Sequence, residues 1–409
     1  MIPFSPPRID QKVINEVIET LKSGWITTGP RTKRFEKEIT AYCGCKSTLA
    51  VNSATSGLEL MLRWFGVKEG DEVIVPAYTY CSTANVVIHC GAKHVFVDVN
   101  PDDFNISIKA LKNAITERTK VIIPVDLGGF PVDFDEINAL VKNAKIKKQF
   151  KPNNTIQKTL NRILIINDSA HSFGAIYKGK KVGTNTDISV FSFHAVKNLT
   201  TCEGGAICLN LPSPFDNNEV YKYLCMYSLH GQNKDALSKA QKGNWRYDVI
   251  EAGYKANMPD ILSAIGLVEL GRYDNDTLIK RQKIFNVYSK AFEKLPWSQI
   301  PVFETLDKKS SFHVYLLRIN GISENQRDDI INRIYEREVS VNVHFQPLPM
   351  LSFYKKLGYN ILDYPVAYDN YSREISLPVY YDLTDEQVKL VKSNPAAMSW
   401  VKNGDLSLG

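Results

Sequence analysis

The stretch that decides the fold reads Ser189-Val-Phe-Ser-Phe-His-Ala-Val-Lys197-Asn-Leu-Thr-Thr-Cys-Glu-Gly-Gly205. Its apolar run over residues 188–193 is typical of a buried strand, and a second apolar run over residues 206–209 follows the Glu-Gly-Gly turn. A lysine placed just past a buried strand lies near apolar walls, where partial desolvation yields a nucleophilic amine. Such an amine can form a Schiff base with an aldehyde or a carbonyl substrate. Taken alone, however, a strand-end lysine more often simply reaches into solvent.

Four further apolar, β-branched runs precede this stretch, at residues 71–76, 94–98, 121–125 and 163–166. Helix-like segments lie among the runs, at residues 56–65, 83–90, 108–115 and 134–143. Strands and helices that alternate in this way predict an α/β domain with a mostly parallel sheet flanked by helices. Ligands of such sheets bind beyond the carboxyl ends of the strands, so the residues just after each run are the candidates for a site.

In the rest of the chain, the pattern of predicted helices and strands changes near residue 300. Before it, we expect a helix over residues 10–23, a loop insertion over residues 147–161 and a long helix from Met258 to about Leu295. Beyond it, the segments 312–318 and 339–344 and two amphipathic helices indicate a small α+β domain; the helices span residues 325–336 and 384–393. The residues from Pro395 onward carry no strong pattern. We therefore predict a large α/β domain over residues 1–275 and a small C-terminal domain over residues 276–409.

Composition excludes several classes of function. The 409 residues are 44% hydrophobic and 23% charged, and the formal net charge of +6 is small for this length, with no basic face that suggests nucleic acid. No apolar run approaches the roughly 20 residues that span a bilayer, and the N-terminus does not read as a signal peptide. The seven cysteines show no metal-ligand spacing, which favours free thiols in a reducing cytoplasm. We expect a cytoplasmic protein without a metal site.

Asp168 is the first partner that the sequence offers for Lys197. It closely follows the run at residues 163–166, one strand before Lys197, so both side chains can face the same crevice of a parallel sheet. A carboxylate there is costly unless a cation meets it, although a cap for the following turn is the commoner explanation. Together, an aspartate and a Schiff-base lysine form the minimum set for pyridoxal phosphate, because the aspartate keeps the pyridine nitrogen protonated.

A phosphate site is predicted at the start of the helix that follows Ala50-Val-Asn-Ser-Ala-Thr-Ser-Gly57. Free N–H groups and the positive end of that helix can face an anion, and the hydroxyl of Ser192 can join them. Tyr80 lies past the end of another strand, where its ring can stack on a flat cofactor. For the first feature an ordinary Ser/Thr N-cap is a common alternative, and for Tyr80 core packing is about equally open.

In this order, the pieces resemble the DegT/DnrJ/EryC1/StrS family of pyridoxal-phosphate sugar aminotransferases, which have the type I aspartate-aminotransferase fold. The resemblance covers nearly the whole chain. Its motifs are Ser23-Gly-Trp-Ile-Thr-Thr-Gly-Pro30, Phe191-Ser-Phe-His-Ala-Val-Lys197 with Glu203-Gly-Gly205, Ser228-Leu-His-Gly231, Gly253-Tyr-Lys-Ala-Asn257-Met-Pro-Asp260, and Gly358-Tyr359 after His344-Phe-Gln-Pro-Leu348.

The resemblance implies catalytic roles for three residues. Lys197 would bind the cofactor through a Schiff base and then move the proton between cofactor and substrate carbons. Asp168 would pair with the pyridinium nitrogen. His171 stands where the family often has Gln, and would bond the cofactor near its phenolic oxygen.

The family resemblance also implies cofactor-binding roles for five more residues. Tyr80 would stack on the ring, Ala54 and Thr55 would bind phosphate through their amides, and Ser192 would add its hydroxyl. Asn257 would reach the phosphate from the neighbouring subunit, since the family forms dimers with shared active sites.

The activity implied is transfer of an amino group, from glutamate, to a 4-keto or 3-keto nucleotide sugar for amino-sugar and surface-polysaccharide synthesis. Two alternatives stay open: an elimination enzyme of the same family, such as a sugar dehydratase, and a regulatory homologue that binds the cofactor without catalysis. The dehydratase branch has His in place of the lysine, so Lys197 argues against it. Pro349 stands where many members have a second histidine, so no sugar contact is predicted there.

Overall fold

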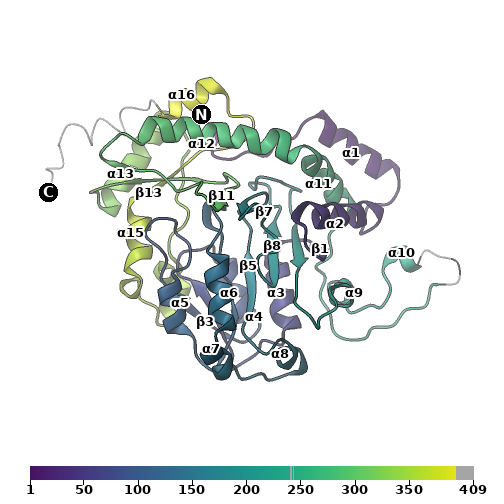
Figure 1. Ribbon diagram of the computed structural model, residues 1–409. Helices are drawn as coiled ribbons and strands as arrows, with labels where there is room; N and C mark the ends of the chain where they lie inside the picture. Colours follow the sequence, from purple (N-terminus) through teal and green to yellow (C-terminus); the bar gives the residue numbers. More distant parts are fainter. Residues whose placement is uncertain (240–241, 243, 393–409) are drawn as a thin grey trace.

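The computed structural model describes residues 1–239, 242 and 244–392 of the chain. Within that part, seven strands form the central sheet, in the order β1-β9-β8-β5-β4-β2-β3 (Figure 1). From β8 to β3 all neighbours are parallel, whereas β9 is antiparallel to both of its neighbours. The strands are β1 (Ser47–Val51), β2 (Glu72–Pro76), β3 (Lys93–Val97), β4 (Thr119–Ile122), β5 (Leu164–Asp168), β8 (Ile188–Ser192) and β9 (Gly205–Leu209). All five predicted strands are present, and β1 is an addition.

Helices lie on both sides of this sheet (Figure 1). Every residue of β1, β2, β4, β5 and β9 is buried, which explains why the strands read as continuous apolar runs rather than alternating ones. The helices of this part are α1 (Gln11–Lys22), α2 (Pro30–Cys43), α3 (Ala54–Trp64), α4 (Ser82–His89), α5 (Ile108–Ala114), α6 (Phe134–Lys142), α7 (Ala144–Gln149), α8 (Thr155–Leu160), α9 (Asn217–Tyr227), α10 (Ala236–Lys239) and α11 (Asp260–Arg272).

A second hydrophobic core lies in the C-terminal part, apart from the one around the large sheet. It packs around the antiparallel sheet β10-β12-β13 and includes Ile2 from the start of the chain. The division into domains at residues 275 and 276 stays a prediction, and the small domain below means the part built around this second core. The elements here are α12 (Leu278–Phe292), β10 (Ser298–Gln299), β12 (Tyr315–Ile319), α13 (Glu324–Tyr335), α14 (Ser352–Lys356), α15 (Pro365–Arg373), β13 (Glu374–Leu377) and α16 (Asp385–Lys392). A small third sheet joins β11 (Lys308–Lys309), β6 (Ile176–Tyr177) and β7 (Lys180–Lys181).

Three local predictions were wrong. The insertion at residues 147–161 is not a plain loop, because it contains all of α8 and the end of α7. The predicted helix over residues 258–295 is interrupted by a π-helical turn at Tyr273–Thr277, which separates α11 from α12. Segment 339–344 forms isolated bridges, Val339 with Ile2 and Asn342 with Ser376, instead of a strand. The residues from Pro395 onward lie outside the described part.

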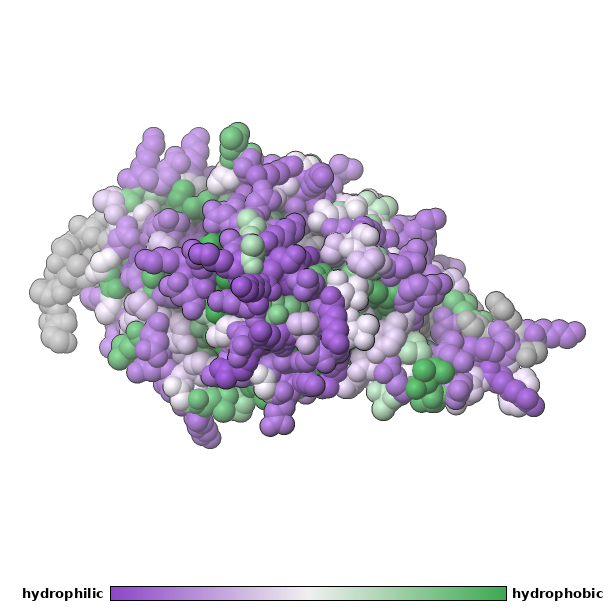
Figure 2. All heavy atoms as spheres, turned by 60° about the horizontal axis from the view of Figure 1, so that its bottom comes forward, coloured by the Kyte–Doolittle hydropathy of each residue, from purple (hydrophilic) through white to green (hydrophobic). Residues whose placement is uncertain are grey.

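The described residues between α9 and α11 project from the body of the molecule, as Figures 1 and 2 both show. They carry four large apolar side chains that are more than half exposed: Trp245, Tyr247, Val249 and Ile250. Elsewhere, the face seen in Figure 2 is mainly polar. None of the helices in the described residues is both long enough and apolar enough to cross a membrane.

Candidate active site

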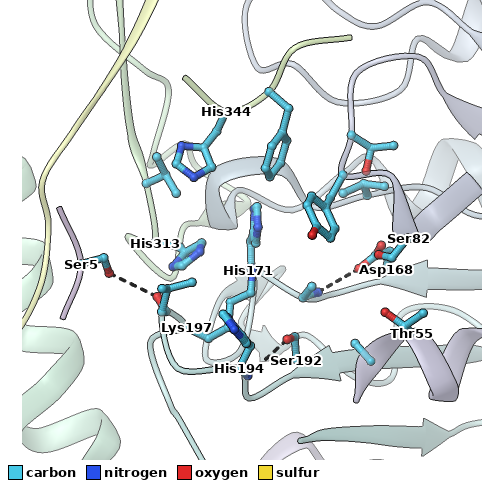
Figure 3. A pocket seen from close by; sticks show the side chains of 18 of the residues that line it. Ser5, Thr55, Ser82, Asp168, His171, Ser192, His194, Lys197, His313 and His344 are labelled. Atoms are coloured by element: carbon cyan, nitrogen blue, oxygen red, sulfur yellow. Dashed lines mark hydrogen bonds between the residues drawn. The ribbon is translucent and has the colours of Figure 1, made fainter. Parts of the chain in front are cut away.

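A cavity of about 640 Å³ opens where β5 and β8 end, between the large sheet and the small domain (Figure 3). β5 and β8 are neighbours, and Asp168 at the end of β5 is in register with Val190 of β8. The lining includes seven of the predicted residues: Ala54, Thr55, Tyr80, Asp168, His171, Ser192 and Lys197. Asn257 lies outside this lining, where its side chain contacts Thr28 and Lys255 of the same chain.

Lys197 follows β8 in a turn in which its backbone N–H donates to the carbonyl of His194 (2.9 Å). The next residue, Asn198, fixes the turn because its amide donates to the carbonyl of Ser311 in the small domain (2.7 Å). The side chain of Lys197 faces the cavity and is partly buried, and desolvation lowers its pKa to about 8, against a smaller opposing effect of Asp168. A substantial share of neutral amine is therefore present near neutral pH, as a nucleophile requires.

Asp168 presents a buried carboxylate to the same cavity. One oxygen accepts from the hydroxyl of Thr83 (2.8 Å) and the other from the backbone N–H of Ala170 (3.2 Å). Burial raises its pKa, while these hydrogen bonds and the charge of Lys197 lower it. Neither hydrogen-bond partner carries a positive charge, so the carboxylate is arranged to meet a cation that enters the cavity.

His171 is held in one tautomer by the backbone of the large domain. Its Nδ1 lies 3.3 Å from the backbone nitrogen of Gly128, and this N–H can only donate, so Nδ1 accepts and the ring proton resides on Nε2. Burial, with a smaller contribution from Lys197, keeps its pKa well below the usual value and the ring neutral. His171 therefore lines the cavity as a neutral hydrogen-bond donor.

The first turn of α3 presents backbone N–H groups to the cavity. Ser53 caps this helix by accepting from the N–H of Ser56 (3.1 Å), which leaves the N–H groups of Ala54 and Thr55 at the edge of the cavity. Gly205 of β9 presses against this turn, because a Cβ there would lie 2.6 Å from the nitrogen of Ala54. The Glu-Gly-Gly turn lets the chain double back so that Ser192 pairs with Gly205.

Two further predicted residues complete the wall. The side chain of Tyr80 is 59% exposed, and its ring centroid lies 5.8 Å from that of Phe345, which also lines the cavity. An exposed aromatic ring inside a cavity is a surface on which a flat ligand can stack. The hydroxyl of Ser192 accepts from the backbone N–H of His194 at 3.4 Å and is partly open to the cavity.

Sequence reasoning missed the part of the wall that comes from the small domain and the N-terminus. Phe4, His313 and His344 line the cavity, and Figure 3 shows the two histidines close to His171, above Lys197. The ring of His313 lies 4.5 Å from that of His171, and its Nδ1 is 2.8 Å from the side-chain oxygen of Asn198. The motif His344-Phe-Gln-Pro-Leu348 was a signal for His344, whereas nothing in the local sequence marks Phe4 or His313.

Cys202, in the turn between Lys197 and β9, has a backbone φ of +69°. A side chain in this left-handed region costs about 1–2 kcal/mol, which glycine would avoid, although the greater flexibility of its unfolded chain would offset part of this gain. We expect Cys202→Gly to raise the free energy of unfolding by about 0.5–1 kcal/mol in a urea titration. Cys225→Gly, inside α9, is the matched control and should lower it by about 1 kcal/mol. A loss of stability in the Cys202 variant would contradict the strain.

The family model described as "DegT/DnrJ/EryC1/StrS aminotransferase family" matches residues 7–148 and 154–394. Among curated proteins, "Spore coat polysaccharide biosynthesis protein SpsC" of Bacillus subtilis is 36% identical over 393 residues, which cover 95% of this chain and 94% of SpsC.

Solved structures agree with this match. The PMP form of "Putative sugar aminotransferase Spr1654 from Streptococcus pneumoniae" has a TM-score of 0.94 at 43% identity, covering 98% of this chain and 100% of that one. Its PLP form gives a TM-score of 0.92 at 42% identity, with 98% and 99% covered. Helicobacter pylori PseC, an "aminotransferase involved in the biosynthesis of pseudoaminic acid", gives 0.83 at 29% identity, with 96% and 97% covered. The predicted family, fold class and aminotransferase activity are confirmed, and this chain belongs to the DegT/DnrJ/EryC1/StrS aminotransferase family.

Proposed function

We propose that this chain is a pyridoxal-phosphate-dependent transaminase that moves an amino group from L-glutamate to a keto-sugar carried on a nucleotide. The observation that carries the proposal is the placement of Lys197 and Asp168 at the ends of two adjacent parallel strands, in one cavity. The similar protein Spr1654 has been solved in PLP and PMP forms, the two states between which a transaminase alternates. The cavity of about 640 Å³ is within the range of small-molecule sites.

The residues present fit this cofactor. Asp168 is a buried carboxylate whose partners, Thr83 and Ala170, are uncharged, and a protonated pyridine nitrogen would supply the missing cation. Gly205 leaves the start of α3 free of side-chain atoms, so that the N–H groups of Ala54 and Thr55 can approach a phosphate.

Pyridoxal phosphate, when bound, supplies an aldehyde that condenses with amines and a ring that takes up an electron pair. Lys197 would provide the amine that holds it, and its Nζ would carry the proton between the substrate carbon and the cofactor carbon. Asp168 would keep the proton on the ring nitrogen by a charge-assisted hydrogen bond. His171 would donate its Nε2–H to the phenolic oxygen.

Four residues hold the cofactor without taking part in proton transfer. Tyr80 would cover one face of the ring, Ala54 and Thr55 would bind the phosphate through backbone N–H groups, and Ser192 would add its hydroxyl. These roles follow the family resemblance, and the position of all four on the cavity wall supports them.

A homodimer completes the proposed enzyme. The projecting segment carries Trp245 and Tyr247, 69% and 52% exposed, on a surface suited to contact with a second copy of the chain. Asn257 would then reach the phosphate in the neighbouring subunit rather than in its own. Cytoplasmic location stays a prediction.

Mixing the purified protein with L-glutamate tests the proposal. We expect the visible absorbance of the lysine-bound cofactor to disappear, the near-ultraviolet absorbance of the PMP form to rise, and one equivalent of 2-oxoglutarate to appear per site. Adding members of a panel of 4-keto and 3-keto nucleotide sugars should restore the visible band for the true acceptor and yield an amino sugar.

The same experiment separates the alternatives. An elimination enzyme would convert a sugar without consuming glutamate, and a regulatory homologue would bind the cofactor but change neither substrate. Either result would overturn the assignment as a transaminase, whereas a positive glutamate reaction with every sugar inactive would overturn the assigned acceptor class.

A further inference from the structure

A chain of hydrogen bonds connects the core of the small domain with the wall of the cavity. Nδ1 of His344 lies 2.9 Å from the hydroxyl of Ser376, and that hydroxyl lies 2.6 Å from Oε1 of Glu374. Oε2 of Glu374 accepts from the backbone N–H of His344 at 3.0 Å. Glu374 and Ser376, both on β13, are fully buried, whereas His344 lines the cavity (Figure 3). One buried carboxyl group is thus linked to both the backbone and the ring of one cavity histidine.

The ring of His344 is held in place by its neighbours. Phe4 stacks on it, with ring centroids 5.3 Å apart and planes inclined by 21°, and Phe345 meets it at 4.9 Å and 71°. Burial and the charge of Lys197 lower the pKa of His344 to about 3, so the ring is neutral and carries one proton. Because Nδ1 is committed to Ser376, Nε2 is the ring nitrogen available to a ligand in the cavity.

The ionised form of Glu374 fixes the direction of the chain. A carboxylate only accepts, so Ser376 donates its proton to Oε1 and must accept from His344 through Nδ1–H. The single proton of the neutral imidazole is then on Nδ1. Nε2 consequently faces the cavity as a hydrogen-bond acceptor.

The protonated form reverses the two side-chain hydrogen bonds, from Ser376 to Glu374 and from His344 to Ser376. Oε2 still accepts from the backbone N–H of His344, so the carboxyl proton resides on Oε1 and is donated to Ser376. The hydroxyl of Ser376 then donates to Nδ1, and the ring proton moves to Nε2. His344 now faces the cavity as a hydrogen-bond donor.

The groups around Glu374 bring its pKa close to neutral pH, so that both its ionised and its protonated form are accessible. Burial raises its pKa to about 8, while Arg327 of α13 and Arg318 of β12 oppose this, Arg318 being the cross-strand neighbour of Glu374. Tyr78, after β2, also faces the carboxyl group: burial and then the charge of Glu374 raise the pKa of its phenol. A carboxyl with a raised pKa keeps its proton below that pKa, so the donor form of His344 prevails near pH 7 and the acceptor form at higher pH.

We propose that Glu374 and Ser376 are positioning residues that set whether His344 donates to or accepts from an oxygen of the bound sugar. The inference rests on the proposed function for the identity of that ligand. The hydrogen-bonded chain itself does not depend on it. At neutral pH the donor form suits a carbonyl oxygen or a hydroxyl oxygen of the substrate.

Nitrogen-15 NMR of the histidine-labelled holoenzyme tests the relay directly, with the signal of His344 assigned by its loss in His344→Gln. Between about pH 6 and about pH 10 we expect the wild-type ring to change from the Nε2–H to the Nδ1–H tautomer, with a midpoint near 8. Glu374→Gln should hold the Nε2–H tautomer throughout, because its amide oxygen keeps the backbone bond and its NH₂ faces Ser376. Lys197 is intact in this variant, so a pH response that persists in it would overturn the proposal.

Variants of Ser376, which lies between His344 and Glu374 in the hydrogen-bonded chain, provide the second measurement. Ser376→Ala should uncouple the ring from Glu374, and Ser376→Thr, which keeps the hydroxyl, should restore the coupling. Ser289→Ala is the matched control, because it removes a buried hydroxyl that bonds Tyr315 (3.0 Å) elsewhere in the small domain. In kcat/KM for the sugar acceptor, we expect an inflection near pH 8 of about threefold to tenfold in wild type, lost in Glu374→Gln and Ser376→Ala.

Equal pH profiles for Ser376→Ala and Ser289→Ala would overturn the relay. Failure of the proposed function gives a different result: the protein would not take an amino group from glutamate, yet the tautomer of His344 would still follow Glu374. A protein that transaminates while this tautomer ignores Glu374 would retain its function and lose the relay.

Discussion

Lys197→Ala is expected to abolish transamination, with kcat reduced at least about 10⁴-fold, and to remove the visible absorbance of the covalently held cofactor. The lysine has two tasks in the proposed reaction, as the amine that holds the cofactor and as the base that moves the proton. Its position after β8 and its pKa of about 8 suit it for both. Turnover measured with glutamate and an acceptor sugar, together with the absorbance spectrum, checks the result.

The control must separate lost chemistry from lost folding. Burying the ammonium group destabilises the folded cofactor-free protein, since the folded pKa of Lys197 is lower than the usual lysine value of about 10.4. The penalty is fully present below about pH 8 and disappears as pH rises toward the unfolded value. Lys197→Met should therefore unfold at an equal or higher temperature than wild type at pH 7, with the difference shrinking near pH 10. Lys180→Ala, at an exposed lysine on β7, should change neither turnover nor spectrum. Retained turnover in Lys197→Ala would refute the assignment.

The strands that carry the site were predictable because burial on both faces leaves a continuous apolar signal. That signal failed at β1, whose sequence Ser-Thr-Leu-Ala-Val begins with two polar residues and runs directly into the predicted phosphate loop. The helix α8 in the insertion was also missed, because its residues are mostly polar. Asn154 caps that helix through the N–H of Gln157, and both side chains reach back to the carbonyl of Phe65. Contacts so distant in sequence leave no local pattern.

The residues of the candidate site also fall into two groups, those that the sequence predicts and those that it does not. Lys197, Asp168 and the first turn of α3 lie at the ends of elements that the sequence reveals, so topology alone brings them together. His313 reaches the cavity because Asn198 and the backbone of Ser311 join the small domain to the turn of Lys197. Phe4 reaches it because Ile2 pairs with Val339 and carries the N-terminus across the small domain. These placements depend on how two cores pack against each other, and residue spacing does not encode that packing.

Asp168→Asn is expected to lower kcat by about 10²–10³-fold and to weaken the binding of pyridoxal phosphate. The neutral amide removes the anion that keeps the ring nitrogen protonated, so electron withdrawal from the reacting carbon fails. Folding should not suffer, because burial raises the pKa of Asp168, and an amide avoids the free-energy cost of burying a charged carboxylate in the cofactor-free protein. Single-turnover measurement of the glutamate half-reaction, with thermal unfolding of the cofactor-free protein, checks both statements.

Asp126 provides the matched control, because it is a second fully buried carboxyl group that lies close by in the fold, outside the cavity lining. Its oxygens accept from Asn167 (2.6 Å), Ser172 (2.6 Å) and the N–H of Val132 (2.9 Å), so its bonding capacity serves the loop that carries Asp168. An asparagine there would face donors with its own NH₂, and we expect Asp126→Asn to cost about 1–3 kcal/mol of unfolding free energy. The turnover of the folded fraction should stay near wild type. The two substitutions make the same chemical change. A loss of rate in Asp168→Asn alone, with a loss of stability in Asp126→Asn alone, would locate the catalytic charge at Asp168. A loss of stability in both variants, without a selective loss of rate in Asp168→Asn, would contradict the catalytic role and make both carboxylates structural.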